Sequence, residues 1–394
     1  MASAVKPEEE ELYMNELAES RAQEIILAGE TYPHMVRVWQ RRHYGDLVAG
    51  KILILSCGCG SIKNAKGFHV WLCGPSGIGK SDSAQKGAEL VDPAYLLDST
   101  VTPQVLFYPT ESFIDGSIVF VDDMVWNSEL GANIKKITTK FQEGAMRTVT
   151  TEGTGTKYRS RKRLVFWITS VDSHADEQIR DRFILVDIDE SPKHLEKAME
   201  SLKDFDMGVC ISEEMEFETR VCRALIRDLR NNLKEVVIPF ADRIEFKGDL
   251  RAYRIFGDMI RCFAIFSYAK RSSDEHGRLI ATEEDFMEAK SLYEEFGGHS
   301  ADKYTTSELK LIRAIIDNGY EATQEDLQRI ADLSVSRVSD ILNGRKDEEQ
   351  QKHGLLYKCS KLIVNRDRKP YKYKLPQGYD PTADRKNLVS LRPT

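Results

Sequence analysis

The chain contains no apolar run of about 18 residues, which is the length that a membrane-spanning helix needs. Its first residues lack the basic start and apolar centre of a secretory leader. Internal repeats and low-complexity stretches are also absent from the sequence. These absences indicate neither a membrane span nor secretion, and we expect a cytoplasmic protein.

Cysteine is scattered rather than clustered. The seven cysteines include one close pair, Cys57 and Cys59, and the single residue between them is too short for the usual zinc-ribbon spacing. Reduced, buried thiols are therefore expected. The net charge of −7 argues against a polycation that coats nucleic acid, although it leaves room for local basic patches.

A chain of 394 residues is long enough for two or three domains. From Phe68 to about Glu190, the short apolar segments "FHVWLC", "SIVFVDD", "LVFWITS" and "RFILVDI" alternate with helix-length segments. This pattern predicts an α/β fold with a parallel sheet that is covered on both faces.

After Glu190 the apolar spacing becomes helical, and strands are expected to stop. Near the end, three short helical patterns precede the strand-like pieces "LLYKCSKLIV" and "KPYKYKL", which predicts a winged helix-turn-helix. The expected organisation is an N-terminal helical or frayed segment at 1–35, an α/β core at 36–190, a helical lid at 191–296, a linker at 297–304, the winged helix at 305–378 and a tail at 379–394.

The octet "GPSGIGKS" fits the phosphate-loop pattern G-x-x-x-x-G-K-[ST] and lies between a predicted strand and a predicted helix. Its glycines let the backbone turn its N–H groups toward phosphates, Lys80 would reach the β and γ oxygens, and Ser81 would hold Mg²⁺. The sequence therefore predicts binding of ATP with Mg²⁺ through Gly74, Pro75, Ser76, Gly77, Ile78, Gly79, Lys80 and Ser81.

The strand "SIVFVDD" ends in two carboxylates downstream of the loop. Asp122 would enter the magnesium shell, and Asp123 would act on the attacking water, because Mg²⁺ lies above the edge of such a sheet. The alternative is that the pair simply terminates a strand. We favour hydrolysis as well as binding.

The order of these elements resembles the AAA+ ATPases, and within them the minichromosome-maintenance (MCM) helicases and their mobile-element relatives. The resemblance covers about residues 36–296, from "YGDLVAGKILI" through the acidic strand, a hairpin and a sensor-1 strand to "TEEDFMEAKSLY". It implies an arginine finger at Arg182 in "RDRFILVDI" and a sensor-2 arginine at Arg254 in "RAYRIFGDMIR", with Arg261 repeating the family's spacing. A finger that completes a neighbour's site implies a homo-oligomeric, hexameric ring.

Three departures from the family stand out. The second acidic residue is Asp123 where the family usually has Glu, so water activation is expected to be weaker. The sensor-1 Asn is replaced by Ser170, with Thr169 as the rival assignment. Only about 66 residues precede the core, so the family's N-terminal nucleic-acid-binding domain is expected to be missing, which suggests a plasmid, viral or mobile-element protein.

Two basic segments are candidates for DNA contact. The first is the hairpin that the family projects into the channel of its ring; here it has Gly153 and Gly155 for a tight turn and the cations Lys157, Arg159, Arg161, Lys162 and Arg163. The alternative is a solvated basic loop without a partner.

The second basic segment is the predicted wing, where Tyr371 and Tyr373 are surrounded by Lys358, Lys361, Arg366, Arg368, Lys369, Lys372 and Lys374, with only Asp367 opposing them. The predicted recognition helix, from about Ser334, offers Ser336, Arg337 and Ser339 to phosphates or base edges. The alternative is docking to a protein.

These features favour a nucleoid-associated, ATP-dependent DNA helicase that holds one strand in a central channel and contacts duplex through the winged helix. The rivals are a replication initiator or helicase loader, a branch-migration motor, and a DNA-bound regulator that uses ATP only to assemble. A transcription activator is disfavoured because no "GAFTGA"-like loop is present.

Overall fold

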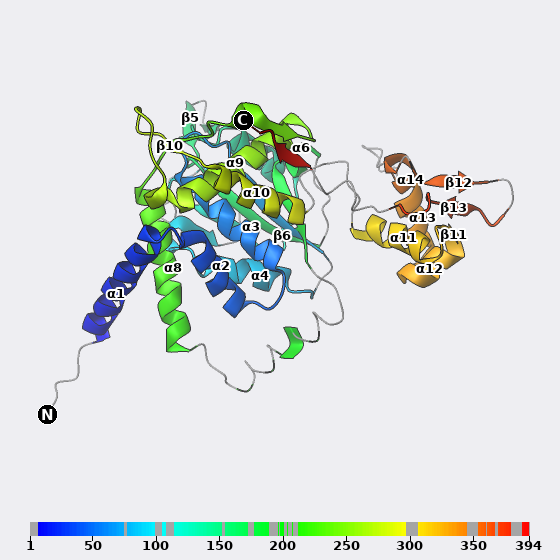
Figure 1. The fold of residues 1–394 in the computed structure, drawn as a ribbon, viewed down its shortest axis with the longest axis horizontal. Coiled ribbons are helices and arrows are strands. Elements are labelled where there is room, and N and C mark those ends of the chain that lie inside the picture. The colour runs from blue at the N-terminus through cyan, green and yellow to red at the C-terminus, as the bar shows by residue number, and fades with distance from the viewer. Residues whose placement is uncertain are drawn as a thin grey trace. The chain divides into compact units, whose positions relative to one another are not determined.

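The computed structural model describes residues 7–74, 77–98, 105–107, 114–151, 154–171, 177–188, 196, 198–200, 203, 207, 212–296, 306–344, 354–359, 361–366, 369–379 and 388–393. The chain forms two compact units (Figure 1). Unit 1 comprises Met1–His299 together with Val389–Thr394, and unit 2 comprises Ser300–Leu388. The expected core and helical lid therefore belong to one compact unit.

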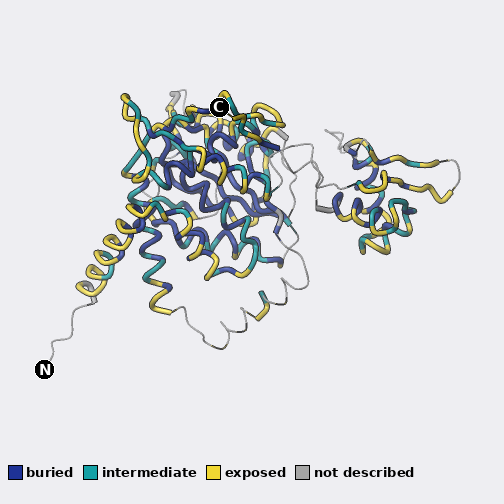
Figure 2. The backbone as a smooth tube through the Cα atoms, viewed as in Figure 1, coloured by how far each residue is buried: buried dark blue, intermediate teal, exposed yellow. Residues whose placement is uncertain are grey.

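A five-stranded parallel sheet forms the centre of unit 1. Its strand order is β2 (Leu96–Asp98), β3 (Ile118–Val121), β6 (Val165–Ser170), β1 (His69–Cys73) and β7 (Phe183–Asp187). Every residue of β1, β3 and β6 is buried, as expected for strands that are covered on both faces (Figure 2). The predicted parallel α/β sheet is confirmed.

Helices cover the two faces of this sheet. On one face, α3 (Leu47–Cys57) and α4 (Lys80–Ala88) pack against β1 and β6, and Trp167 of β6 donates its indole N–H to Ser56 Oγ of α3 at 2.8 Å. On the other face, Leu130 and Ile134 of α5 (Ser128–Thr139) share a core with Trp71 and Phe166. The opposite directions of Trp167 and Phe166 follow from the alternation of side chains along a strand.

The predicted helices of the N-terminal and lid segments are present, and polar caps fix where several of them begin. They are α1 (Pro7–Leu27), α2 (Thr31–Arg42), α8 (Glu213–Asn231), α9 (Leu250–Phe266) and α10 (Glu283–Glu295). Ser212 caps α8, Asp249 caps α9, and Thr282 with Asp285 forms a capping box at α10. Most of the helix expected over residues 191–202 lies outside the described residues.

The expectation that strands stop after Glu190 is wrong. Two-residue strands β8 (Val236–Val237) and β10 (Leu279–Ile280) pair in parallel, and β9 (Ile244–Phe246) pairs antiparallel with β14 (Val389–Leu391). These strands are too short to show a periodic sequence pattern, which is why helical spacing dominates this part of the sequence.

The sequence had indicated a free tail at 379–394, but residues 389–391 form a strand that pairs with β9. Strand β14 returns to unit 1, where the Val389 side chain is fully buried and the Arg392 N–H donates to Arg243 O at 3.0 Å. Unit 2 is consequently joined to unit 1 at both of its ends rather than at one.

Unit 2 has its own apolar core, built around Leu311, Leu327, Val338, Leu342 and Tyr373. Its helices are α11 (Thr306–Asp317), α12 (Gln324–Ala331), α13 (Val335–Asn343) and the short α14 (Leu355–Lys358), and its antiparallel sheet has the order β11 (Glu321–Thr323), β13 (Lys372–Lys374) and β12 (Ile363–Asn365). The first part of "LLYKCSKLIV" is thus helical where a strand was expected, and β11 was not expected.

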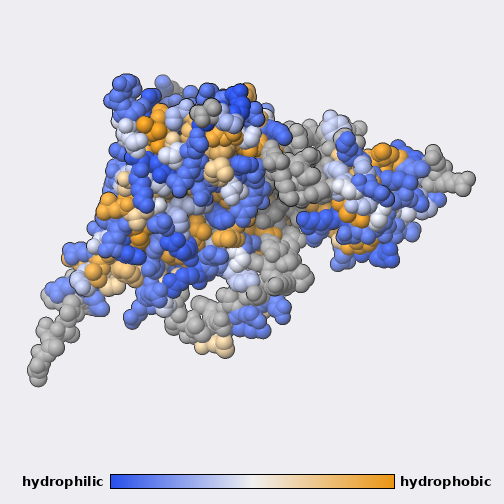
Figure 3. All heavy atoms as spheres, viewed as in Figure 1, coloured by the Kyte–Doolittle hydropathy of each residue, from blue (hydrophilic) through white to orange (hydrophobic). Residues whose placement is uncertain are grey.

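Hydrophilic residues cover most of the face drawn in Figure 3, with apolar residues interspersed among them. Among the helices that the structure describes, none is long and apolar enough to span a membrane.

We expect Val389→Asp to detach β14 and to lower the free energy of unfolding of unit 1 by about 2–4 kcal/mol, because it places an unpaired carboxylate in an apolar site. Chemical unfolding would measure this loss. The neighbouring Ser390 is exposed, so Ser390→Ala is the control, with an expected change of about 0.5 kcal/mol or less. Equal stability of the two variants would contradict the importance of the returning strand.

Candidate functional site

The phosphate loop begins where β1 ends and leads directly into α4, which starts at Lys80. Gly74, Gly77 and Gly79 have φ values of 149°, 81° and 96°, a region that residues with a Cβ rarely adopt. Lys80 is 4% exposed and lies at the first position of α4. The predicted strand, glycine loop and helix are confirmed, whereas Pro75 and Ser76 lie outside the described residues.

The acidic pair lies at the same edge of the sheet. Asp122 and Asp123 follow β3 directly, and both are exposed. Val121 pairs with Ile168, and the next residue of β6, Thr169, pairs with Leu72 near the end of β1. Because the strands are parallel, the acidic pair and the phosphate loop meet at their carboxyl ends.

Thr169, rather than Ser170, contacts the acidic pair. Its hydroxyl donates to Asp122 Oδ1 at 2.5 Å and accepts the Asp123 N–H at 2.9 Å. Ser170 points to the opposite face of the sheet, where its hydroxyl accepts the indole N–H of buried Trp71 at 2.8 Å. Thr169 therefore faces the acidic pair and Ser170 faces Trp71, because neighbouring residues of a strand face opposite ways.

A third carboxylate, Asp98, lies at the same edge as Asp122 and Asp123 and was not predicted from the sequence. It is the last residue of β2, which pairs with β3, and its side chain forms a hydrogen bond with the side chain of Gln85 of α4. Burial and the negative charge of Asp122 raise its pKa above the ordinary value. The signal was present, since "LLD" ends in a carboxylate as "SIVFVDD" does, but three residues are too few to predict a strand.

The donor atoms at this edge fit magnesium that arrives with a nucleotide. Ser81 offers a hydroxyl and Asp122 a carboxylate, which are the hard oxygen ligands that Mg²⁺ prefers. Within the described ranges, no group of three or more His, Cys, Asp or Glu residues is arranged to hold a metal by itself. This agrees with the usual Mg²⁺ site, where one or two carboxylates act together with substrate phosphates.

Comparison with known proteins agrees with this geometry. The family model described as "MTBMA_p00010 P-loop domain" matches residues 16–232, which is more than half of the chain. The chain belongs to this P-loop domain family. A curated relative, "Uncharacterized protein MTBMA_p00010" of Methanothermobacter marburgensis, is 24% identical over 399 residues. The alignment includes 91% of this chain and 48% of the relative, so the chain spans about half of the relative's length.

Membership of the family makes a nucleotide the expected ligand of residues 74–81 and nucleotide hydrolysis the general expectation for the P-loop domain. The matched range includes α1 and α2 as well as the sheet and α8. It ends before α9, which carries Arg254, and before unit 2.

Arg182 lies at the opposite edge of the P-loop domain's sheet from the phosphate loop. It precedes Phe183, which pairs with His69 at the start of β1, whereas Gly74 follows the end of β1. Along the strand direction, six residue positions separate Arg182 from Gly74, which corresponds to about 20 Å. The side chain is half-buried and donates to Gln178 O at 3.0 Å, and burial with the nearby charge of Arg251 lowers its pKa.

Arg254 lies near this second edge. It is exposed on the first turns of α9 and lines a cavity of about 380 Å³ together with Asp181, Asp249, Leu250 and Arg251. Arg251 forms an ion pair with Asp181 at 2.5 Å. The structure thus brings Arg254 to Asp181, the residue next to Arg182, and leaves both arginines away from the phosphate loop of the same chain.

Arg261, the second arginine of the sensor-2 pattern, has a structural role. It donates to Asp258 at 3.0 Å, and the same buried carboxylate accepts the backbone N–H groups of Lys66 and Gly67 at 2.8 and 2.9 Å. This network fixes α9 to the segment that precedes β1.

The predicted basic hairpin is confirmed as β4 (Met146–Thr151) and β5 (Thr154–Arg159). Residues 152 and 153 at its turn, and the side chains of 150–155, lie outside the description. Lys157 pairs with Thr148 three positions from the turn and is exposed, as is Arg159. Arg159 also donates to Glu143 O at 3.2 Å.

The cations that follow the hairpin are less available than the sequence suggested. Arg161 and Lys162 are partly buried, and the backbone N–H of Lys162 donates to a carboxylate oxygen of Asp115 at 2.9 Å. Arg163 donates to Gly60 O at 3.0 Å, and burial lowers its pKa. Arg163 therefore fixes the base of the hairpin to the body of unit 1 rather than extending to the tip.

In unit 2, Arg337 is exposed on the first turn of α13, and Arg366 and Lys369 are exposed around β12 and β13. Arg368 and Asp367 lie outside the described residues. The expectation that only Asp367 opposes the wing is wrong. Glu321 of β11 forms ion pairs with Lys372 at 2.6 Å and with Lys374 at 2.5 Å, which reduces the positive charge of this sheet.

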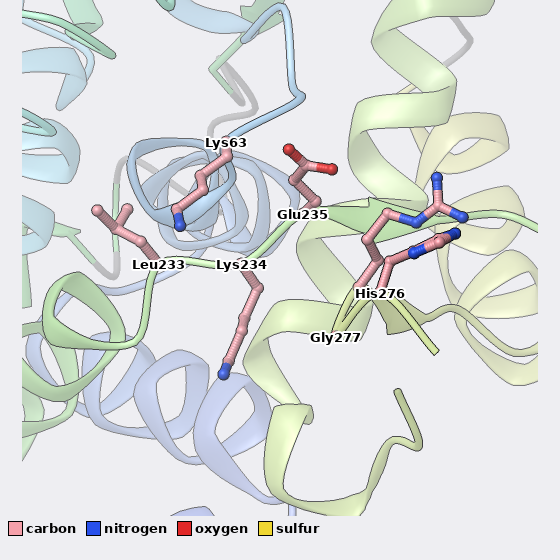
Figure 4. Close-up of a pocket in the computed structure, with 7 residues that line it drawn as sticks. Lys63, Leu233, Lys234, Glu235, His276 and Gly277 are labelled. Atoms are coloured by element: carbon pink, nitrogen blue, oxygen red, sulfur yellow. The ribbon is translucent and has the colours of Figure 1, made fainter. Parts of the chain in front are cut away.

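A surface cavity of about 470 Å³ lies elsewhere on unit 1 (Figure 4). It is lined by Lys63, Leu233, Lys234, Glu235, His276, Gly277 and Arg278. None of the described phosphate-loop or acidic residues lines it, and Arg278 already pairs with Asp274 at 2.7 Å. The cavity has no part in the site described above.

We expect Thr169→Val to lower kcat for nucleotide hydrolysis by about 10- to 100-fold while nucleotide affinity stays within about threefold, because Asp122 and the Asp123 N–H lose the hydroxyl that positions them. Ser170→Ala is the matched control. It removes the hydrogen bond to Trp71 and should lower stability by about 1 kcal/mol without a comparable loss of kcat. A large loss of kcat in Ser170→Ala but not in Thr169→Val would show that Ser170, rather than Thr169, positions the hydrolytic groups.

Proposed function

We propose that this chain is an AAA+ motor of the MCM-like kind, which hydrolyses ATP in a homo-oligomeric, hexameric ring and unwinds duplex DNA. The observation that carries the proposal is the separation of its two charged edges. The phosphate loop and acidic pair lie at one edge of the sheet, and Arg182 lies about 20 Å away at the other.

The chemistry proposed for the first edge follows from its geometry. Lys80 would neutralise charge on the β and γ phosphates, and Ser81 and Asp122 would hold Mg²⁺. When bound, Mg²⁺ supplies neutralisation of the charge on the phosphate oxygens. Asp123 would accept the proton of the attacking water, while Thr169 fixes both the Asp122 carboxylate and the Asp123 backbone.

The second edge supports assembly. A cation that stabilises the transferring phosphoryl group has to contact it, and an arginine side chain does not span about 20 Å. Arg182 and Arg254 therefore serve the phosphate loop of a neighbouring copy. Subunits that each complete the next one's site are related head to tail, and such contacts form a ring where the rotation between subunits closes.

Two separate basic surfaces support DNA as the partner. The exposed Lys157 on the β4–β5 hairpin offers a point charge to a phosphate backbone. In unit 2, helices α11 to α13, the β12–β13 hairpin and Arg337 on the first turn of α13 support a winged helix as the second DNA-contacting surface. This unit would contact duplex while the hairpin follows one strand.

A second candidate is an initiator, helicase loader or branch-migration motor, or a DNA-bound regulator that uses ATP only to assemble. Asp123 favours this group, because a side chain one methylene shorter than Glu gives weaker water activation. The neutralisation of Lys372 and Lys374 by Glu321 also favours a protein partner for unit 2.

Unwinding of a forked DNA duplex tests the motor. We expect wild type to separate the strands with ATP, and Lys157→Ala to lose unwinding by about 10-fold or more while its hydrolysis of ATP stays within about twofold. Lys80→Ala should lose both activities. Lys270→Ala removes an exposed lysine of unit 1 outside the hairpin and should leave unwinding unchanged. Hydrolysis without strand separation by wild type would favour the initiator or loader.

Mixing of inactive variants tests the ring. Arg182→Ala and Lys80→Ala should each lower ATP hydrolysis by about 100-fold alone. Mixed subunits should recover measurable hydrolysis, because some interfaces join an intact Arg182 to an intact Lys80. The mixture is compared with equal total concentrations of each variant alone. Absence of recovery, with mixed assembly shown by tagged subunits, would argue against a finger supplied by the neighbour.

A further inference from the structure

His43 lies between two carboxylates beside the phosphate loop. It follows α2, and its Nδ1 is 2.6 Å from Asp82 Oδ2 while its Nε2 is 3.1 Å from Asp46 Oδ2. His43 and Asp46 are buried, whereas Asp82 is exposed on the first turn of α4, next to Ser81. A carboxylate faces each ring nitrogen, and both nitrogens can donate only when the ring is protonated, so this geometry favours the imidazolium form.

The ring is also close to the loop backbone. A Cβ placed on Gly79 would lie 3.8 Å from Cε1 of His43. One turn earlier in α2, the fully buried Trp39 packs against the His43 ring, with centroids 5.0 Å apart, and donates its indole N–H to Ser83 O of α4 at 3.1 Å. Trp39 and His43 thus hold α2 against two consecutive residues of α4, directly after the phosphate loop.

The charge balance at this point bears on an anionic ligand. Without the imidazolium, Asp82 and Asp46 would lose the cation that faces both of them, and their negative charges would lie beside the phosphate loop. Like charges destabilise each other, and the effect is strongest where burial limits screening by water.

We propose that His43 is a positioning residue for the nucleotide: its imidazolium neutralises Asp46 and Asp82 and fixes the first turn of α4, which strengthens binding of the triphosphate. The inference rests on the proposed nucleotide binding at residues 74–81. No sequence motif includes His43, which lies 31 residues before the loop starts.

The role has a defined pH dependence. Burial alone would lower the pKa of His43, but the hydrogen bonds and negative charges of Asp46 and Asp82 outweigh it, and the pKa lies above its ordinary value. The described charged groups that contact the ring nitrogens are Asp82 on the first turn of α4 and Asp46, which directly precedes α3. The stabilisation that protonated His43 gives to the folded protein is complete below the pKa of an unfolded histidine, about 6.5. It is lost as the pH rises through the higher pKa of His43 in the folded protein.

The test measures the Kd of a fluorescent ATP analogue with Mg²⁺, and KM and kcat for ATP, between pH 6 and 9. For His43→Gln at pH 7, we expect Kd and KM to rise about 10-fold with kcat within about twofold, and the pH dependence of KM to flatten. The double variant His43→Gln/Asp82→Asn should recover Kd to within about threefold of wild type, because one repulsive charge is removed.

His34→Gln is the matched control. His34 is a buried histidine within α2, and its Nε2 lies 2.9 Å from a carboxylate oxygen of Glu218 of α8. Its replacement should lower the Tm without changing Kd or the pH profile. Asp82→Asn covers the case in which His43→Gln does not fold, since Asp82 is exposed. It should shift the midpoint of the KM profile to lower pH, because one carboxylate that raises the His43 pKa is lost.

The outcomes separate the two levels of the proposal. Wild-type binding of the analogue together with an unchanged Kd in His43→Gln, or an unshifted midpoint in Asp82→Asn, would overturn the role of His43 alone. Failure of wild type to bind the analogue would overturn the proposed function and, with it, this inference.

Discussion

The parallel register of β1, β3, β6 and β7 is the constraint on which the rest of the structure depends. Parallel strands end at one edge, so Gly74, Asp122 and Thr169 are brought together although about 95 residues separate the first from the last. The same register places Arg182 at the opposite edge. The parallel register therefore brings the phosphate loop and the acidic pair together and keeps Arg182 of the same chain at the other end of the strands.

Helices from both ends of the P-loop domain are bonded to the helices that cover its sheet. Arg42 of α2 forms an ion pair with Glu89 at the end of α4 and donates to Thr219 of α8 at 2.6 Å. Arg230, at the other end of α8, is buried and donates to Cys57 O and Ser61 Oγ at 2.8 and 2.7 Å, at the end of α3. A cation suits this position, because carbonyl groups carry the negative end of the helix dipole. These contacts join α8 to α2 and to the end of α3.

Much of the architecture was predictable because its signals are local. Buried parallel strands appear in the sequence as short apolar runs, and the positive φ values of the phosphate loop favour glycine. The lid strands β8, β9 and β10 and the return of β14 were not predictable, since two or three residues show no period and their partners are distant in sequence. Thr169 and Ser170 could not be separated by sequence, because which of them faces Asp122 depends on the orientation of β6.

The sequence by itself determined the phosphate loop, the acidic strand end and the order of elements, because each depends on the conformational limits of a few neighbouring residues. Only the tertiary structure decided which side chains meet. It brought Asp98 to Asp122, Glu321 to the wing lysines, and His43 to the first turn of α4. Contacts of this kind join residues from separate elements, and their geometry exists only once the sheet has set the position of each helix.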